Sequence, residues 1–497
     1  MARSNKLGGR KGSPEKPIEK LFETIVEDVV KTAALPFNDW WALSPSPLVP
    51  LAIPVSQGRE YRVTQVGVDA AHELTRQIWE KREDFRQTIA REEFVKLSFT
   101  AIGQTIMNSH THLPQDIHDD STTLIDDSFY IALSADYVDI LNRLADQARP
   151  DVDRHIPCHL FHSDQQVPAF SVGPVEFRPR AEWIDRFVTN AAERAHVRQV
   201  ETGALHMEDL RRRALSPGSA RDLYNAWSVL SALRGFTWVA TIRMTGHELS
   251  RSHEKASTII GLAIDAIGLR FQVEDARRFI KAGRQHLFAE DRLATSIDGA
   301  FLQGWSMQMP GLGSKPGALA AKMSAERPFL DAAGCILNAY VQGRQVERAP
   351  HLVERWANAL YWVGEARRET SDFMAIVNYG CAADGLSGAG GNSNKMIEFA
   401  NAALNPKEEL ASTGSMSIDE AVTTIYREGR NKLAHGEVPG LLEDLSRPRA
   451  IGDVLLMSLF DVVTVELAEI IANRPQILTV DEKHAYRAMQ DRLRQRS

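Results

Sequence analysis

The chain has 497 residues, of which 43% are hydrophobic and 25% are charged, and these ordinary globular values exclude wholesale disorder. Its length predicts two or three domains of usual size. The formal net charge of -7 argues against a protein that binds nucleic acid over its whole surface, because such proteins usually carry a basic excess. Any contact with RNA is therefore expected to be local.

Cysteine usage and hydropathy indicate a cytoplasmic protein that does not enter a membrane. The three cysteines are far apart and odd in number, which predicts neither a disulfide framework nor a cysteine zinc site and favours a reducing compartment. Residues 451–471 form the most apolar long segment, but four acidic side chains interrupt it, so no membrane span is expected.

Residues 1–16 are basic and rich in Gly and Ser, and no apolar signal core follows them. We interpret them as a disordered arm, while a nucleic-acid role for their basic side chains stays open. Apolar residues at helical spacing from Ile18 to Val30 then predict an amphipathic helix. A proline-rich run ends it, and a second helical region is expected over residues 70–107.

Two histidine-rich stretches raise the question of a metal site. Within residues 108–121, three histidines and two adjacent aspartates could ligate a metal: His110, His112, His118, Asp119 and Asp120. Their spacing matches no known ligand framework, and Pro114 with its polar neighbours indicates a loop. In residues 155–162 the apolar positions alternate, which fits a half-exposed strand better than a metal site. We therefore predict no metal and no cofactor.

Residues 17–317 are predicted to form a mixed α/β region, divided near residue 200 if it holds two subdomains. Residues 169–178 indicate either a pair of strands or one strand with a Gly-Pro turn, and residues 235–244 indicate another strand. A strongly apolar helix is expected after them, over residues 253–271. The glycine-rich stretches 311–317 and 385–391 lack the ending of a phosphate-binding loop and are interpreted as connections.

From residue 318 onward the pattern is helical throughout. Helices are predicted over residues 318–326, 329–344, 351–369, 371–386, 393–404, 418–435, 449–472 and 481–496. Short connections favour antiparallel neighbours, so residues 318–475 are expected to form an all-α bundle, followed by a charged helix within 476–497. The broad apolar face of residues 451–471 is expected to supply core, a dimer surface, or both. The fold class is thus α+β followed by a helical bundle.

The segment from Ser417 to Glu437 combines a clear local structure with reactive side chains. Ser417 and Glu420 form a capping box, and apolar residues every three or four positions predict one buried stripe. Spacing by four places three polar side chains on one edge of this helix, with Arg430 beside them: Arg427, Asn431 and His435. Gly436 follows as a C-terminal cap.

The run Arg430-Asn431-Lys432-Leu433-Ala434-His435 resembles the Arg and His motif of HEPN domains, a family of helical nucleotide-binding domains, and in particular the Apea-like HEPN group. Asp384, within Cys-Ala-Ala-Asp-Gly-Leu, stands where these domains often carry an acidic residue on an earlier helix. The resemblance covers residues 350–475. Three other Arg and His pairs have similar spacing, but only this one has Asn after Arg at the end of a capped helix. The alternative is a structural role, in which both side chains cap a helix and pair with carboxylates.

The resemblance implies a metal-independent endoribonuclease that acts as a homodimer. In it Arg430 would hold the scissile phosphate and His435 would move protons, while Asn431 would orient either the phosphate or His435. Further RNA contacts are predicted at Arg427, Lys432 and Asp384, with Arg447 and Arg449 as additional basic candidates. The alternative for these basic residues is ordinary surface charge. By analogy, residues 17–317 would sense a phage or stress signal and restrain a toxin-like abortive-infection effector. The competing interpretation is a non-catalytic HEPN module that binds nucleotide or RNA.

Overall fold

The computed structural model describes residues 16–43, 51–56, 58–109, 127–284, 289–307, 309–342, 350–404, 416–434, 436 and 444–496. Contacts within the chain divide it into two compact units. Unit 1 comprises residues 1–152 with 244–255, and unit 2 comprises residues 153–243 with 256–497. The described chain is mostly helical and carries small antiparallel sheets, as the α+β class predicts. Residues 1–15 of the predicted arm lie outside the described part.

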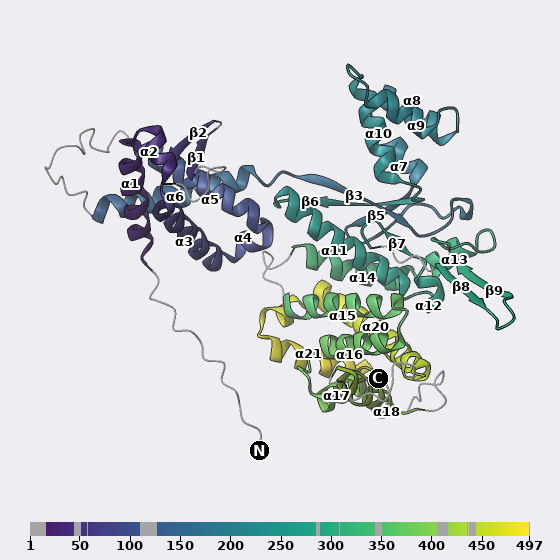
Figure 1. The fold of residues 1–497 in the computed structure, drawn as a ribbon. Helices are drawn as coiled ribbons and strands as arrows, with labels where there is room; N and C mark the ends of the chain where they lie inside the picture. The colour runs from purple at the N-terminus through teal and green to yellow at the C-terminus, as the bar shows by residue number, and fades with distance from the viewer. Residues whose placement is uncertain are drawn as a thin grey trace. The chain divides into compact units, whose positions relative to one another are not determined.

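Unit 1 is a helical layer with one short hairpin (Figure 1). Its elements are α1 (Ile18–Ala33), α2 (Phe37–Ala42), β1 (Ala52–Ser56), β2 (Arg59–Arg62), α3 (Gln65–Lys81), α4 (Glu83–Thr88), α5 (Arg91–Ser109) and α6 (Asp127–Gln147). Helix α1 packs on α3 and α6, and the stripe predicted from Ile18 onward supplies the fully buried Phe22 and Ile25. The predicted helical region 70–107 is present, but it is broken into α3, α4 and α5. The hairpin of β1 and β2 was not predicted.

Unit 2 begins with a five-stranded sheet in the order β4-β5-β6-β3-β7. Its strands are β3 (Val152–His159), β4 (Phe170–Val172), β5 (Val175–Pro179), β6 (Trp238–Met244) and β7 (Ile280–Lys281). Of the two arrangements predicted for residues 169–178, the strand pair is present, because Val172 pairs with Val175 in an antiparallel register across Gly173. The strand predicted over 155–162 is confirmed as β3, and the one over 235–244 as β6. A separate hairpin joins β8 (Ala289–Thr295) to β9 (Phe301–Met307).

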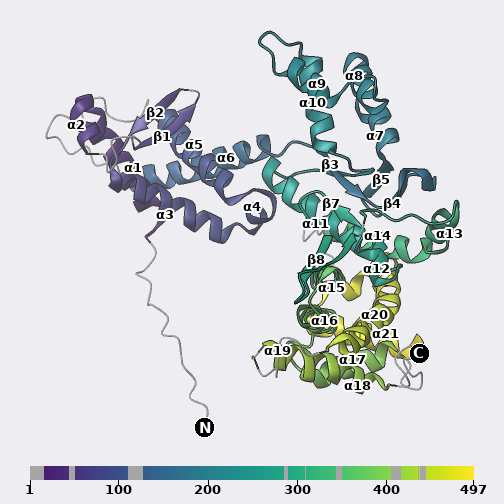
Figure 2. The same ribbon diagram turned by 45° about the vertical axis from the view of Figure 1, so that its right-hand side comes forward.

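A helical insertion separates β5 from β6, although the two strands pair with each other. It contains α7 (Arg180–Phe187), α8 (Ala191–Glu201), α9 (Met207–Ala214) and α10 (Arg221–Leu233). These helices bury their own cluster, which includes Trp183, Val197, Leu210 and Leu230. Figures 1 and 2 show them grouped beyond one end of the sheet strands. The insertion is therefore a small helical body carried on a sheet hairpin, and the sequence did not predict it.

The remaining helices of unit 2 include those predicted after residue 318. They are α11 (Leu249–Gly268, whose first residues belong to unit 1), α12 (Val273–Ala276), α13 (Ala318–Ala325), α14 (Arg327–Gln342), α15 (Pro350–Arg368), α16 (Asp372–Ser387), α17 (Ser393–Ala403), α18 (Ile418–Val422), the π-helix Thr423–Asn431, α19 (Lys432–Ala434), α20 (Ser446–Asn473) and α21 (Glu482–Arg496). The described part of the chain thus contains a counterpart of each helix predicted after residue 318. Helix α20 packs against α14, α15, α16 and α21, so most of its apolar face is core of this chain.

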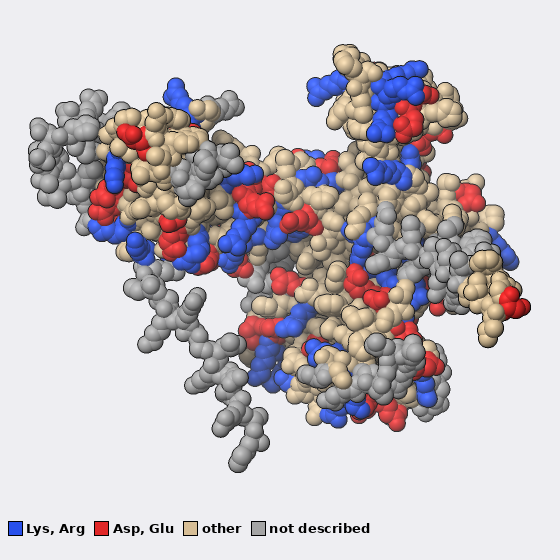
Figure 3. Space-filling model, in the orientation of Figure 1, with Lys and Arg blue, Asp and Glu red and all other residues tan. Residues whose placement is uncertain are grey.

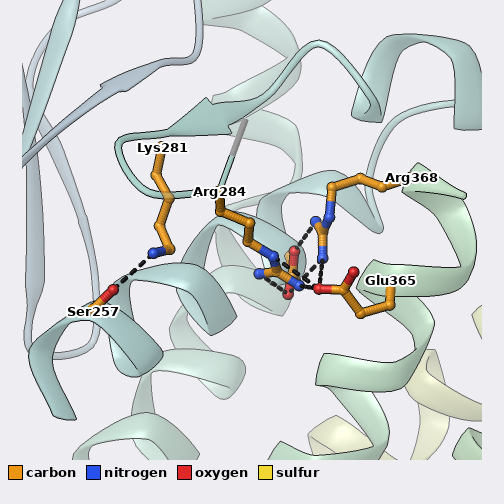
Figure 4. Close-up of polar contacts among 6 residues, drawn as sticks. Ser257, Lys281, Arg284, Glu365 and Arg368 are labelled. Carbon is orange, nitrogen blue, oxygen red and sulfur yellow. Dashed lines mark hydrogen bonds and ion pairs between the residues drawn. The ribbon is translucent and has the colours of Figure 1, made fainter. Parts of the chain in front are cut away.

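A buried polar network joins the sheet side of unit 2 to the bundle (Figure 4). The side chain of Asp265 on α11 has no exposed surface and pairs with Arg284, after β7, and with Arg368 on α15. Arg284 Nε also donates to Glu365 Oε1 at 2.9 Å, and Arg368 Nη2 donates to the same oxygen at 3.3 Å. Gly364 makes room for this network, because a Cβ there would lie 2.4 Å from Asp265 Cγ. The buried carboxylate is thereby satisfied by two guanidinium groups.

A second set of contacts continues the network into the bundle. Arg367 Nε donates to Asp453 Oδ1 on α20 at 2.8 Å, and its Nη2 donates to the carbonyl of Phe271 at 2.9 Å. Tyr379 on α16 donates its hydroxyl to the same Asp453 oxygen at 2.8 Å. These contacts cross residue 317, where the sequence predicts a domain boundary. By contacts, residues 153–243 belong to the same unit as the C-terminal helices.

Replacement of Asp265 with Ala should strongly destabilise unit 2. The change leaves Arg284 and Arg368 buried with only Glu365 as an acidic partner, and removal of one partner of a buried pair typically costs about 3–5 kcal/mol. Urea unfolding monitored by circular dichroism measures the loss. The control is Asp331→Ala, which breaks the exposed pair with Arg327 and should cost less than about 1 kcal/mol. Equal effects of the two changes would contradict the structural role of the network.

Candidate functional site

The segment from Ser417 onward begins as the sequence predicts. Ser417 Oγ accepts from the Glu420 N–H, and the Glu420 carboxylate accepts from the Ser417 N–H, which completes the capping box. The predicted stripe is buried, with Ile418, Val422 and Ile425 exposing 3% or less of their surface. Gly436 has φ 72° and donates its N–H to the carbonyl of Leu433, as expected of a helix cap.

The predicted regular α-helix is wrong in its middle, because Thr423–Asn431 form a π-helix. Hydrogen bonds from i to i+5 change the angular step per residue, so side chains four apart no longer stack as they do on an α-helix. Arg427 accordingly reaches α17, where its Nε donates to Ser393 Oγ at 2.9 Å and its Nη2 donates to Asn394 Oδ1 at 3.1 Å. The row predicted from Arg427 through Asn431 is therefore not one continuous edge. Its third member, His435, lies outside the described residues.

Arg430 and Asn431 do lie together. Arg430 Nη1 donates to Asn431 Oδ1 at 3.1 Å and contacts the Tyr426 hydroxyl at 3.5 Å. The Arg430 guanidinium also lies 5.5 Å from the centre of the Tyr426 ring, within cation–π range. Both partners are neutral, and no carboxylate of the described residues lies within ion-pair distance of Arg430. The guanidinium is thus held in place without being neutralised.

Asp384 approaches the same place from α16. Its Oδ1 accepts from the Gly391 N–H at 2.9 Å, which closes the glycine-rich stretch 385–391 back onto the helix. This stretch follows a helix and connects α16 to α17, as its interpretation as a connection predicts. Burial and the negative charge of Asp384 raise the pKa of Tyr426, while Arg430 opposes that effect. Asp384, Tyr426 and Arg430 therefore share one electrostatic environment.

The other predicted basic residues are less available. Lys432 forms an exposed ion pair with Glu428 of the π-helix. Arg449 is 13% exposed, donates to Asp372 Oδ1 at 2.7 Å and donates to the carbonyl of Glu369 at 2.6 Å. Its proposed contact with phosphate is therefore corrected to a structural role between α20 and the start of α16. Arg447 is exposed.

Tyr426 is a site residue that the sequence reasoning missed. Its side chain is 1% exposed, and its hydroxyl lies between Arg430 and Gly391, whose Cβ would be 3.6 Å away. The available signal was its position four residues before Arg430, since such pairs interact on helices. An aromatic residue within a buried stripe usually belongs to the core. Tyr426 belongs to the core and also contacts the Arg430 guanidinium through its hydroxyl.

Gly380 permits the close approach that positions Arg430. A Cβ at Gly380 would lie 2.5 Å from Arg430 Cβ and 2.8 Å from its Cγ, so α16 touches the stem of the arginine directly. Backbone contact of this kind fixes where the guanidinium can point. Arg430 is half-buried for the same reason, and only its outer part faces solvent.

No metal site is found in the part of the chain that the structure describes, which holds no cluster of three His, Cys, Asp or Glu side chains with suitable geometry. The stretch from His110 to Asp120 lies outside that part. His155 is engaged in the sheet, where its Nδ1 accepts from Trp183 Nε1 at 3.1 Å and lies 3.0 Å from Thr241 Oγ1. Cys158 is buried and free, and burial raises the pKa of its thiol.

Comparisons with known proteins add no family assignment: the chain matches no protein-family model, no curated protein and no solved structure. Within the described residues, no helix is long and apolar enough to cross a bilayer. The function must therefore be argued from the residues around Arg430.

Replacement of Gly380 with Ala should destabilise the bundle and displace Arg430. The added methyl overlaps the arginine stem, and overpacking of this kind costs about 1–3 kcal/mol. Gly385→Ala on the same helix is the matched control, because its Cβ would meet Ala359 at an ordinary 3.7 Å. That control should be neutral or stabilising by up to about 1 kcal/mol. Urea unfolding of both variants tests the prediction, which fails if Gly380→Ala is as stable as Gly385→Ala.

Proposed function

We propose that this chain is a metal-independent endoribonuclease of the HEPN type, with its active site around Arg430, Asn431 and His435. The observation that carries the proposal is the state of Arg430. Its guanidinium is half-buried and oriented by the neutral Tyr426 hydroxyl and Asn431 amide, so its charge remains available for a phosphate. The well-buried Arg367, Arg368 and Arg284 are instead neutralised by carboxylates.

The chemistry needs no cofactor. The 2′-oxygen of the RNA attacks the adjacent phosphorus, the bond from phosphorus to the 5′-oxygen breaks, and the products are a 2′,3′-cyclic phosphate and a 5′-hydroxyl. Arg430 would bind the non-bridging phosphate oxygens and stabilise their charge in the transition state. His435, with a side chain that titrates near neutral pH, would take the proton from the 2′-hydroxyl or give one to the leaving oxygen. Asn431 would keep the Arg430 guanidinium oriented.

RNA contacts beyond the reacting phosphate would come from Arg427 and Lys432, with Asp384 positioning the Gly391 loop beside them. Arg427 is exposed and held by uncharged partners on α17, so it too retains its charge. Lys432 would have to exchange Glu428 for phosphate. This exchange is inexpensive, since exposed ion pairs contribute only about 0–1 kcal/mol.

By analogy with multidomain HEPN proteins, the proposal extends to a cytoplasmic, toxin-like effector in anti-phage or stress defence, restrained by residues 17–317 until a signal arrives. Expression of the full chain and of a chain without these residues, with and without phage, addresses this extension. Unchanged toxicity and protection after the deletion would contradict a sensor role.

Purified protein should cleave RNA in the presence of EDTA, and Arg430→Ala should lower the rate by at least about 100-fold, as expected for loss of a transition-state cation. His435→Ala should do the same through loss of proton transfer. The readout is the appearance of 5′-hydroxyl ends. The control is Arg327→Gln, which removes an exposed arginine on α14 that pairs with Asp331, and it should cleave like wild type.

Each other outcome has a definite meaning, provided that all variants are folded by circular dichroism. Equal cleavage by wild type and both site variants would place the chemistry elsewhere. RNA or nucleotide binding that requires Arg430 but yields no new ends would favour the alternative, a non-catalytic HEPN binding module. This alternative draws on the same observation, because an oriented and unneutralised guanidinium binds phosphate whether or not it cuts.

A homodimer is expected, since HEPN ribonucleases bring two such motifs into one cleft. Light scattering coupled to size-exclusion chromatography should give twice the mass of one chain, with RNA present or absent. Most of the apolar face of α20 is already buried within the chain, so its exposed Val465 is a poor candidate for the contact. A monomer in the presence of substrate would contradict this part of the proposal.

A further inference from the structure

The helical insertion of unit 2 carries a cationic pocket that lies apart from the site around Arg430. Residues 180–234 contain nine arginines, no lysine and seven acidic residues, a local positive excess in a chain with net charge -7. Basic side chains gather over these helices in Figure 3. The pocket has a volume of about 600 Å³, within the range of small-molecule sites, and lies between the end of α8, α9, α10 and the start of α7.

Three arginines line this pocket: Arg180, Arg211 and Arg234. Arg180 is held by Glu201 and by the carbonyl of Phe236, yet its Nε is buried and has no hydrogen-bond partner among the described residues. Buried donors without a partner are rare in folded proteins and call for an explanation. Among the described residues, Arg211 forms an ion pair only with Glu208, at 3.5 Å. Both side chains are more than half exposed, which leaves the charge of Arg211 largely unneutralised.

Arg234 has an unusual backbone. It caps the end of α10 with φ 24° and ψ 57°, in the left-handed region that non-glycine residues seldom occupy. Glycine follows it at position 235, also with positive φ. No described residue forms a hydrogen bond or ion pair with the Arg234 guanidinium. Strain at a residue that projects an unpaired cation into a pocket is a feature of ligand sites, where the ligand rather than the fold uses the side chain.

The remaining wall is apolar and aromatic. Trp227 is half-buried and packs one side against the core of the insertion, while it also lines the pocket beside Met207 and Leu230. An indole in a pocket wall that also contains arginines offers an aromatic surface for a flat ring. Glu208 is the acidic residue on the lining, so the cations outnumber it.

We propose that this pocket binds a small phosphate ester of a flat heterocycle, that is, a ligand of mononucleotide size. Arg211 and Arg234 bind the phosphate, and the ring stacks on Trp227. This inference does not rest on the proposed ribonuclease activity. The pocket would give residues 17–317, the region predicted to sense a signal, a defined ligand site.

The test is calorimetric titration of the full chain with AMP, adenosine and inorganic phosphate, carried out in the Arg430→Ala background so that the candidate nuclease site does not contribute. AMP should bind more tightly than either fragment. Arg234→Gly should weaken AMP binding at least about tenfold, because it removes a charge-assisted contact. Glycine adopts positive φ without strain, so this variant should be at least as stable as its parent, and lost binding then reports the guanidinium rather than unfolding.

Arg212→Gln is the matched control, since Arg212 lies on α9 beside Arg211 but is 79% exposed and does not line the pocket. It should bind AMP within about twofold of its parent. The proposal is overturned if AMP does not bind at millimolar concentration, or if Arg234→Gly binds it unchanged. It is also overturned if phosphate or adenosine alone binds as tightly as AMP. None of these outcomes depends on RNA cleavage, so failure here is distinct from failure of the ribonuclease proposal.

Discussion

The buried carboxylate of Asp265 is the interaction on which the rest of unit 2 depends. It lies on α11, next to the sheet, and it is paired with guanidinium groups from the end of β7 and from α15. Burial of an unpaired carboxylate costs much free energy. The packing of these elements therefore depends on the two arginines that pair with Asp265. Gly364 completes the requirement, because any side chain there would occupy the space of the carboxylate. Sheet and bundle are thus joined by a contact that has few alternative solutions.

From this network a chain of contacts leads to the candidate site. Arg367, the neighbour of Arg368 on α15, meets Asp453 of α20, and Asp453 also receives the hydroxyl of Tyr379 on α16. The residue after Tyr379 is Gly380, whose backbone touches the stem of Arg430. Helix α16 is therefore fixed through Tyr379, which bonds to the paired carboxylate of Asp453. Its Gly380 in turn positions Arg430. Rigid support of this kind is what a phosphate site needs, since its donors must be oriented before the ligand arrives.

Two groups among the arginines of this protein differ in their surroundings. Those in the core, such as Arg284 and Arg368, are neutralised and serve packing. Arg430 and Arg234 are positioned but lack an acidic partner among the described residues, one through a π-helical turn and a tyrosine, the other through a strained cap. Since burial of an ion pair contributes little net stability while an oriented free cation binds anions, the second group is where function is expected.

The sequence by itself determined the local structure well, because helix caps and apolar periodicity act over a few residues. The capping box at Ser417, the buried stripe from Ile418 to Leu433 and the hairpin across Gly173 all follow from neighbouring side chains. The sequence motif likewise indicated Arg430 and Asn431, which are consecutive in the chain, as candidate site residues. The four-helix insertion, the pairing of Asp265 with residues some twenty and a hundred positions away, and the π-helical turn that redirects Arg427 were decided only by the tertiary structure. These features depend on contacts between segments that are far apart in the sequence. The periodicity of one segment does not indicate which distant segment it will contact.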